Sequence, residues 1–351
     1  MDLNLKQMVK IKRNKFLAPK VVFVDGLWGC GKTMLSPILS SMDRVELLSY
    51  IYELENICSL FYLKKISKNG AEAMIKFTTD LKIYNTMMSR DVNFRPSDLS
   101  SVYNDSNPKR YFDRLIEKGD ELIPEKILNE KPILNIATHN MLAFSDPIFS
   151  ALKKRACFIE VVRHPLYMIK QIHLNMERLL NSPRNFNLFY EFNKKDVPAF
   201  AYGWENLFLN SNNMDKAIFY IQKISEKTTA NKKKIKSKYP NQVLTICFEK
   251  FVINPNDYLK KIEELLSTSV IKSTWNMLKK QNVPRKKISQ GLELDIYKRC
   301  GWEPSKKGLS EKEELEVRRN YVEKFASKSA LIVMDNLCND YEKLYMKDIL
   351  L

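Results

Sequence analysis

Residues 21–33 read VVFVDGLWGCGKT. The first four residues are apolar and mostly β-branched, which is the pattern of a buried parallel strand. The last eight, Gly26 to Thr33, follow the pattern of a glycine, four residues, Gly-Lys and then Ser or Thr. Three of the nine glycines of the chain fall in these eight residues, which argues against a chance match. The stretch therefore predicts a phosphate-binding loop between a buried strand and a helix over 33–41.

Each residue type in this loop suits an anion. Glycines adopt positive φ and let oxygens approach the backbone amides. Successive N–H groups then form an anion nest, which the N-terminus of the next helix completes. Lys32 would place its charge on the outer phosphate or sulfate, and Thr33 would offer a hydroxyl to the anion or to a magnesium ion. The loop residues expected to contact a nucleotide are Gly26, Trp28, Gly29, Cys30, Gly31, Lys32, Thr33 and Met34.

The side chains of two loop residues have no role fixed by the motif. Trp28 packs either beneath the nucleotide or against the sheet, and the sequence favours neither. Cys30 is expected to be a small loop residue rather than a nucleophile, because no neighbour in the sequence suggests an activated thiolate.

Composition narrows the classes of partner. The 351 residues are 44% hydrophobic and 28% charged, as in an ordinary folded domain, and carry a net charge of +17. Such a charge suits anionic partners, although a lysine-rich composition with a solvated surface explains it equally well. No recognition helix, zinc finger or aromatic RNA-binding motif accompanies the charge, so nucleic-acid binding is not expected.

The spacing of the cysteines and the length of the apolar runs indicate whether the protein binds a metal or crosses a membrane. The six cysteines form no CxxC pair, which argues against a zinc site and against a disulfide framework. No run approaches the roughly 20 apolar residues of a membrane span, and no signal peptide follows the basic N-terminus. We therefore expect no membrane span and no bound metal, and a cytoplasmic protein.

The remaining pattern predicts an α/β fold. Further strands are expected over 44–48, 132–137, 156–162 and 243–248, and helices over 167–180 and 256–266. Short strands alternating with helices favour a central parallel sheet in a three-layer P-loop fold. We expect a basic tail over 1–19, a single domain over 20–351 with a helical insertion over about 50–131, and C-terminal helices over about 310–351. Ser310 and Glu313 have the spacing of a capping box, and the apolar run 330–335 is expected to be a helix face.

Several later segments resemble the sulfotransferase family that uses phosphoadenylyl sulfate (PAPS). The run 158–165, FIEVVRHP, resembles the family's strand ending in an arginine that binds the 3′-phosphate of the donor. The run 137–139, ATH, resembles the strand end that supplies a general-base histidine. The run 243–251 with the following Asn254-Pro255 resembles the family's late strand, turn and helix, and 285–287 lies where the family has a basic segment over the 3′-phosphate. These patches occur in the family's order, whereas 50–131 has no match.

The resemblance implies roles for particular residues. Arg163, Gln171, Arg285 and Lys286 would bind the donor, and His139 would take a proton from an acceptor hydroxyl, assisted by the charge of Lys32. The chain departs from the family in two places: Lys32 has the position typical of a nucleoside triphosphatase, and Gln171 replaces the family's serine. Without the resemblance, His139 could simply cap a strand, and residues 285–287 could be a solvated run.

Two other functions fit the same loop. A kinase using ATP with magnesium is favoured by Lys32-Thr33, but no strand tip delivers a carboxylate unless Asp25 or Glu160 serves. The protein could also bind a nucleotide at the loop without catalysing a reaction, and His139 would then be dispensable. The sequence does not identify the hydroxyl acceptor or the oligomeric state.

Overall fold

The computed structural model describes residues 9–178, 182–301, 303 and 308–347. Its centre is a sheet of five parallel strands in the order β2-β3-β1-β4-β7. The strands are β1 (Lys20–Asp25), β2 (Ser49–Tyr50), β3 (Ile133–Ala137), β4 (Ala156–Val162) and β7 (Val243–Cys247). The predicted α/β class with a central parallel sheet is confirmed.

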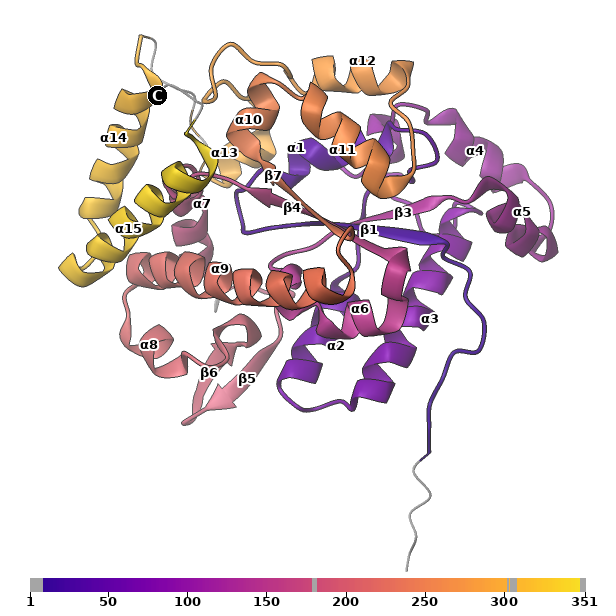
Figure 1. The fold of residues 1–351 in the computed structure, drawn as a ribbon, viewed down its shortest axis with the longest axis horizontal. Coiled ribbons are helices and arrows are strands. Elements are labelled where there is room, and N and C mark those ends of the chain that lie inside the picture. The colour runs from indigo at the N-terminus through magenta and orange to yellow at the C-terminus, as the bar shows by residue number, and fades with distance from the viewer. Residues whose placement is uncertain (1–8, 179–181, 302, 304–307, 348–351) are drawn as a thin grey trace, which may run out of the picture.

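Helices cover both faces of this sheet and make three layers (Figure 1). Above it in Figure 1 lie α1 (Lys32–Ser40), α10 (Phe248–Ile253), α11 (Asn256–Leu266) and α12 (Lys272–Lys280). Below it lie α2 (Tyr52–Tyr62), α3 (Lys68–Thr86), α6 (Asp146–Leu152) and α9 (Asn213–Lys238). Strands β1 and β4 are buried along most of their length, as a parallel sheet covered on both faces requires.

The segment between β2 and β3 is helical. After α2 and α3 it contains α4 (Lys109–Ile116) and α5 (Ile123–Glu130), at the right of Figure 1. The expected strand over 44–48 is wrong: Arg44 has φ of 58° and only Val45 bridges to β3. A left-handed residue breaks the extended backbone that a strand needs, so regular pairing starts later, at Ser49.

Other expected elements agree with the structure. β3, β4, β7 and α11 lie where the sequence placed them, and α7 (Pro165–Arg178) begins two residues before the predicted helix. The capping box of Ser310 and Glu313 opens α14 (Glu311–Glu323), which precedes α15 (Lys328–Tyr345). The run 330–335 is part of α15, and its Asp335 pairs with Arg319. Elements not foreseen include α8 (Glu205–Asn210), α13 (Asp295–Arg299) and the hairpin of β5 (Phe189–Phe192) and β6 (Lys195–Pro198).

The expected N-terminal tail falls partly outside the described residues. From residue 9 onward it lies against α3, because Ile11 exchanges hydrogen bonds with Asn69 and the backbone of Leu17 donates to Asp80. In the part of the chain that the structure describes, no helix is long and apolar enough to cross a membrane.

Candidate active site

Three strand ends bring the predicted site residues to one edge of the sheet. The glycine-rich loop follows β1, His139 follows β3, and Arg163 follows β4. Because β1 pairs with both β3 and β4 in parallel, these three carboxyl ends are neighbours. In open α/β sheets this edge is where ligands bind.

Three glycines set the backbone of the loop. Gly26, Gly29 and Gly31 have φ of 147°, 83° and 109°, values that favour glycine. Space adds a second requirement, since a Cβ on Gly31 would lie 2.4 Å from the ring of Phe248. A Cβ on Gly26 would lie 2.5 Å from the carbonyl oxygen of Val161.

Lys32 is folded back onto the loop. Its ammonium donates to the carbonyl oxygens of Gly26 at 2.6 Å and Leu27 at 3.0 Å. Cys30 is buried with its sulfur 3.8 Å from this ammonium, and burial raises the pKa of its thiol. Thr33 is half-buried in the first turn of α1, whereas Met34 is buried in the core.

Trp28 packs against aromatic side chains below the sheet. Its ring stacks on Tyr220 of α9 at 4.7 Å and meets Phe200 edge-on at 5.6 Å. The hydroxyl of Tyr220 in turn donates to the side chain of Asn140, next to His139. Trp28 therefore ties the loop to α9.

Two arginines lie close to the loop. Arg163 donates from Nη1 to the carbonyl oxygen of Gly29 at 3.0 Å and lies 4.2 Å from the ring centroid of Phe248. Arg285 lies 5.4 Å from the same centroid. The Nε of Arg163 is buried and has no hydrogen-bond partner in the described part of the chain. An unsatisfied buried donor of this kind is costly unless a ligand accepts from it.

The surroundings of both guanidinium groups disfavour their charged forms. Burial and the positive charge of Arg163 lower the pKa of Arg285 to about 10. Burial lowers the pKa of Arg163 as well, with Glu249 opposing the shift and Arg318 adding to it. Arg318 of α14 was not foreseen, and it lies over Tyr167 at 4.6 Å. Such a concentration of positive charge favours a bound anion.

Gln171 and Lys286 have different surroundings. Gln171 lies beside the loop: its Oε1 would be 3.0 Å from a Cβ on Gly29. Lys286 is exposed, although Arg285 next to it is half-buried. Of the basic run 285–287, only the first side chain points toward Phe248.

His139 is held by a carboxylate from the helical insertion. Oε1 of Glu55, in α2, accepts from the backbone N–H of His139 at 3.0 Å and lies 3.2 Å from its Nδ1. Because a carboxylate is only an acceptor, Nδ1 carries the proton and Nε2 is the acceptor nitrogen. Tyr52 stacks beside the imidazole at 6.3 Å. Glu55 could not be found from the sequence, because it lies 84 positions away in a segment without a recognisable motif.

The carboxylates considered for magnesium have other partners. Asp25 is buried and accepts from Thr138, Met141 and Leu142, each at 2.8 Å. Glu160 pairs with Lys232 at 2.6 Å and accepts from Thr245. Both carboxylates therefore have structural partners, and the charge of Lys32 also acts on Asp25, opposing the rise of its pKa that burial causes.

A buried network fixes the strand end that carries Arg163. Glu249 accepts from the backbone N–H of His164 at 2.9 Å and from the hydroxyl of Tyr341 at 2.6 Å. His164 in turn contacts Glu342 through Nε2 at 3.1 Å. The C-terminal helix α15 thus braces the arginine.

Comparison with known proteins gives structural matches only. No protein-family model and no curated protein sequence matches the chain. The sulfotransferase domain of the curacin biosynthetic pathway is 11% identical with a TM-score of 0.43, covering 87% of this chain and 98% of that one. The sulfotransferase STF9 from Mycobacterium avium is 13% identical with a TM-score of 0.39, covering 90% and 79%. The sulfotransferase domain of the Synechococcus olefin synthase is 13% identical with a TM-score of 0.37, covering 91% and 98%. At TM-scores below 0.5, these likenesses do not identify the reaction of this chain.

Proposed function

We propose that the protein is a sulfotransferase that moves a sulfuryl group from phosphoadenylyl sulfate to a hydroxyl of an acceptor. The observation that carries the proposal is the pair Arg163 and Arg285 beside the glycine-rich loop. A donor with phosphate at both the 3′ and 5′ positions needs two separate anion sites, and the loop and the arginines supply one each.

The residues present fit such a donor. The buried Nε of Arg163 has no partner among the described residues, and a phosphate oxygen would satisfy it. Arg163 and Arg285 would hold the 3′-phosphate with help from Gln171, while the loop amides and Lys32 would hold the 5′ end. Lys32 would exchange the carbonyls of Gly26 and Leu27 for the anion.

The donor supplies an electrophilic sulfur attached to a phosphate leaving group. His139 takes the proton of the acceptor hydroxyl on Nε2 while Glu55 holds Nδ1–H. The acceptor oxygen then forms the new bond to sulfur, and the bond between sulfur and the phosphate oxygen breaks. Lys32 and the loop amides stabilise the negative charge on the sulfuryl group and on the departing phosphate.

A magnesium-dependent kinase is the second candidate, and Lys32-Thr33 is the observation that favours it. The contacts of Asp25 and Glu160 weigh against it, because each carboxylate already has protein partners that a magnesium ion would have to replace. A non-catalytic nucleotide-binding protein would leave the Glu55–His139 pair without a role.

The test is thermal unfolding with matched nucleotides. Adenosine 3′,5′-bisphosphate at about 100 times its dissociation constant should add roughly 2.7 kcal/mol of stability, whereas adenosine 5′-monophosphate should add much less. Arg163→Ala should abolish the difference between the two nucleotides. If ATP with magnesium stabilises and the bisphosphate does not, the kinase assignment replaces ours. If the bisphosphate stabilises as expected, transfer of labelled sulfate from the donor to hydroxyl acceptors is measured next, with the unchanged protein and with His139→Ala.

A further inference from the structure

The solvent-facing side of α3 is apolar. Between Gly70 and Thr86 the exposed residues are Met74, Phe77 and Leu81, at 46%, 51% and 45% of their full exposure. Their spacing of three and four residues places them on one stripe along the helix. A surface helix normally presents polar side chains to water, so this stripe indicates a contact surface.

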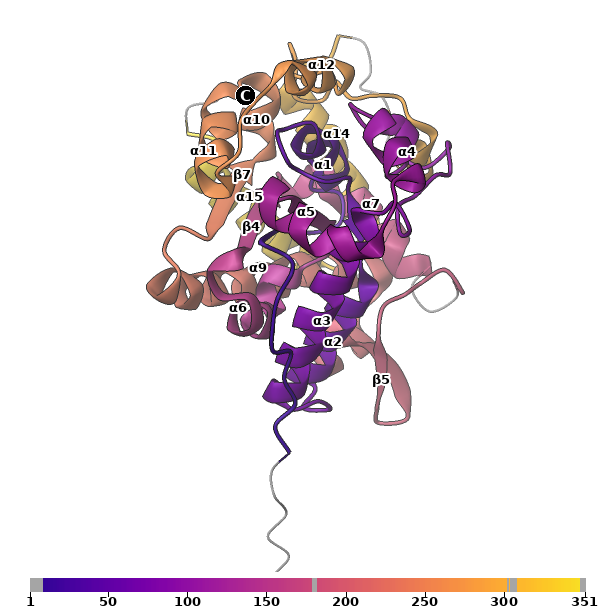
Figure 2. The same ribbon diagram turned by 90° about the vertical axis from the view of Figure 1, so that its right-hand side faces the viewer.

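One end of the stripe is basic. The N-terminal segment 9–16 runs along α3 from Asn69, which exchanges hydrogen bonds of 2.6 Å with Ile11, to Asp80, which pairs with Arg13. Lys10 and Lys12, on either side of Ile11, are exposed at the Asn69 end, and neither forms an ion pair within the described residues. Figure 2 shows this segment running beside α3.

The other end of the stripe carries two exposed glutamates, although Arg90 and Lys126 also lie there, paired with Asp120 and Glu117. The 3-10 turn η2 (Asp120–Leu122) and α5 lie at the C-terminal end of α3, where the hydroxyl of Tyr84 donates to the carbonyl oxygen of Asp120 at 3.4 Å. Glu121 and Glu125 are exposed there, as is the apolar Leu122 at 60%. In Figure 2, α5 lies above α3 and the N-terminal segment lies below and beside it.

We propose that this surface, made of the α3 stripe, residues 9–16 and residues 120–128, binds a second copy of the same surface. A two-fold axis near Phe77 would pair the two α3 helices antiparallel, with the stripes in contact. In a two-fold contact each surface must be complementary to itself. The antiparallel arrangement meets this condition, because it sets the basic end of each copy against the acidic end of the other.

The charge pattern favours this occupant over others. An anionic lipid surface would attract the lysines but repel Glu121 and Glu125, and a uniformly acidic partner would meet the same conflict. The stripe exposes on the order of 300 Å², from about half of three large side chains. A standard interface buries about 800 Å² per partner, so the contact must extend over both charged flanks.

Sedimentation velocity of the full chain between about 1 and 100 µM tests the proposal. The unchanged protein should dimerise in this range. Phe77→Glu should raise the dimer dissociation constant at least tenfold, because two carboxylates meet at the axis. Ile332→Glu is the matched control: this residue is 63% exposed on α15, so the same change there should leave dimerisation intact. Circular dichroism confirms that each variant is folded.

A charge exchange provides the second measurement. Lys10→Glu with Lys12→Glu, or Glu121→Lys with Glu125→Lys, should each weaken the dimer. All four changes in one chain should restore it at an unchanged net charge. The proposal is overturned if the unchanged protein is a monomer at all concentrations. It is also overturned if the variant with all four substitutions dimerises more weakly than both double variants. So does binding to phosphatidylserine vesicles that depends on Phe77 in a chain that remains monomeric.

Discussion

Arg163 and Arg285 share one aromatic ring, at 4.2 and 5.4 Å from the centroid of Phe248, and the charge of Arg163 helps to lower the pKa of Arg285. Their repulsion is a cost that the folded protein carries until an anion binds. The same two charges should therefore oppose stability without ligand and support it with ligand.

Arg285→Gln tests both effects. Without ligand the variant should unfold at about the same temperature as the unchanged protein, because relief of the repulsion offsets the loss of the hydrogen bonds from Arg285 to the carbonyl oxygens of Asn282 and Ile288. Stabilisation by adenosine 3′,5′-bisphosphate should drop, with its dissociation constant raised about tenfold or more. Lys286→Gln is the matched control, since that side chain is exposed. Equal weakening by both variants would show that only the general charge matters.

The Glu55–His139 pair gives a second prediction at this scale. His139→Ala should lower turnover by about 100-fold or more, the usual contribution of a general base, while leaving the stabilisation by the bisphosphate unchanged. Glu55→Gln keeps an oxygen that accepts from Nδ1–H, so it should lose less activity than Glu55→Leu. Equal activity in both Glu55 variants would remove the positioning role.

The sequence predicted which residues lie at the strand ends, but not the side chains from distant helices that contact them. Gly26 to Thr33, His139 and Arg163 follow directly from strands that a local pattern reveals. Glu55 and Arg318 come from helices far along the chain, and only the folded packing of α2 and α14 brings them to the site. The contrast between Arg285 and Lys286 depends on which side chain faces Phe248, which three adjacent charges do not reveal.

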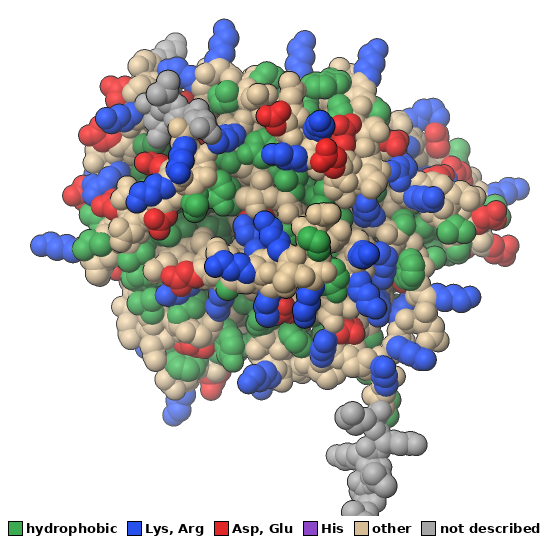
Figure 3. Space-filling view, in the orientation of Figure 1, with side chains coloured by type: hydrophobic (Ala, Val, Ile, Leu, Met, Phe, Trp, Pro, Cys, Tyr) green, Lys and Arg blue, Asp and Glu red, His purple; other side chains and the backbone are tan. Residues whose placement is uncertain are grey.

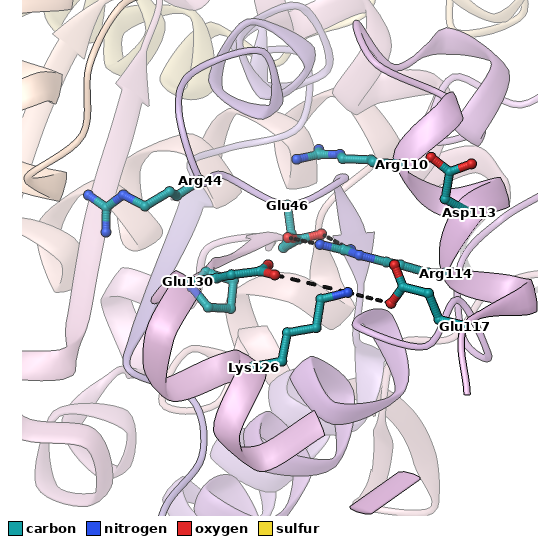
Figure 4. A pocket seen from close by; sticks show the side chains of 9 residues that line it. Arg44, Glu46, Arg110, Asp113, Arg114, Glu117, Lys126 and Glu130 are labelled. Carbon is teal, nitrogen blue, oxygen red and sulfur yellow. Dashed lines mark hydrogen bonds and ion pairs between the residues drawn. The ribbon is translucent and has the colours of Figure 1, made fainter. Parts of the chain in front are cut away.

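Elements with strong periodicity were predicted well and irregular ones were not. The buried run of β4 and the amphipathic face of α11 are local signals that tertiary contacts reinforce. The edge strand β2 has only two residues, and its apparent pattern over 44–48 was misleading because Glu46 turns inward to pair with Arg114 at 2.8 Å. That pair lies in a pocket of Arg, Lys and carboxylate side chains at the opposite edge of the sheet, where β3 begins (Figure 4).

The packing of α15 against the end of β4 predicts a loss of stability in acid. Burial holds the pKa of His164 below 6.5, against the influence of Glu342 and Glu249. Its Nδ1 also accepts from the backbone N–H of Leu166 at 3.3 Å, which the protonated ring could not do. The unfolded chain therefore binds the proton more readily, so the free energy of unfolding should fall as pH drops below about 6.5.

Urea unfolding between about pH 5 and 8 measures this effect. His164→Gln should flatten the slope below about pH 6.5, whatever its stability at neutral pH. His173, whose pKa is also lowered by burial, provides the comparison: His173→Gln should remove only its own share of the slope. An unchanged slope in His164→Gln would mean that the network with α15 does not respond to protons.

At the scale of the whole molecule, the net charge of +17 acts on every anionic ligand. Lys and Arg side chains gather over α9 and beside it in Figure 3, on the face below the sheet. Long-range attraction of this kind is screened within about 8 Å at physiological salt. The bisphosphate should therefore bind several-fold more weakly at about 0.5 M NaCl than at about 0.05 M, measured by titration calorimetry. A dissociation constant independent of salt would contradict an electrostatic contribution.

The strand order also has a consequence for synthesis on the ribosome. β1 is made well before its partners, because β3 and β4 begin only at Ile133 and Ala156. At about 5–20 residues per second, the strand and its glycine-rich loop must wait roughly ten seconds for either neighbour. During that interval the apolar strand β1 is unpaired in the nascent chain. A chaperone could therefore bind it before β3 or β4 does. The proposed nucleotide site therefore begins to form with β1 but can be completed only after β3 and β4 have been made.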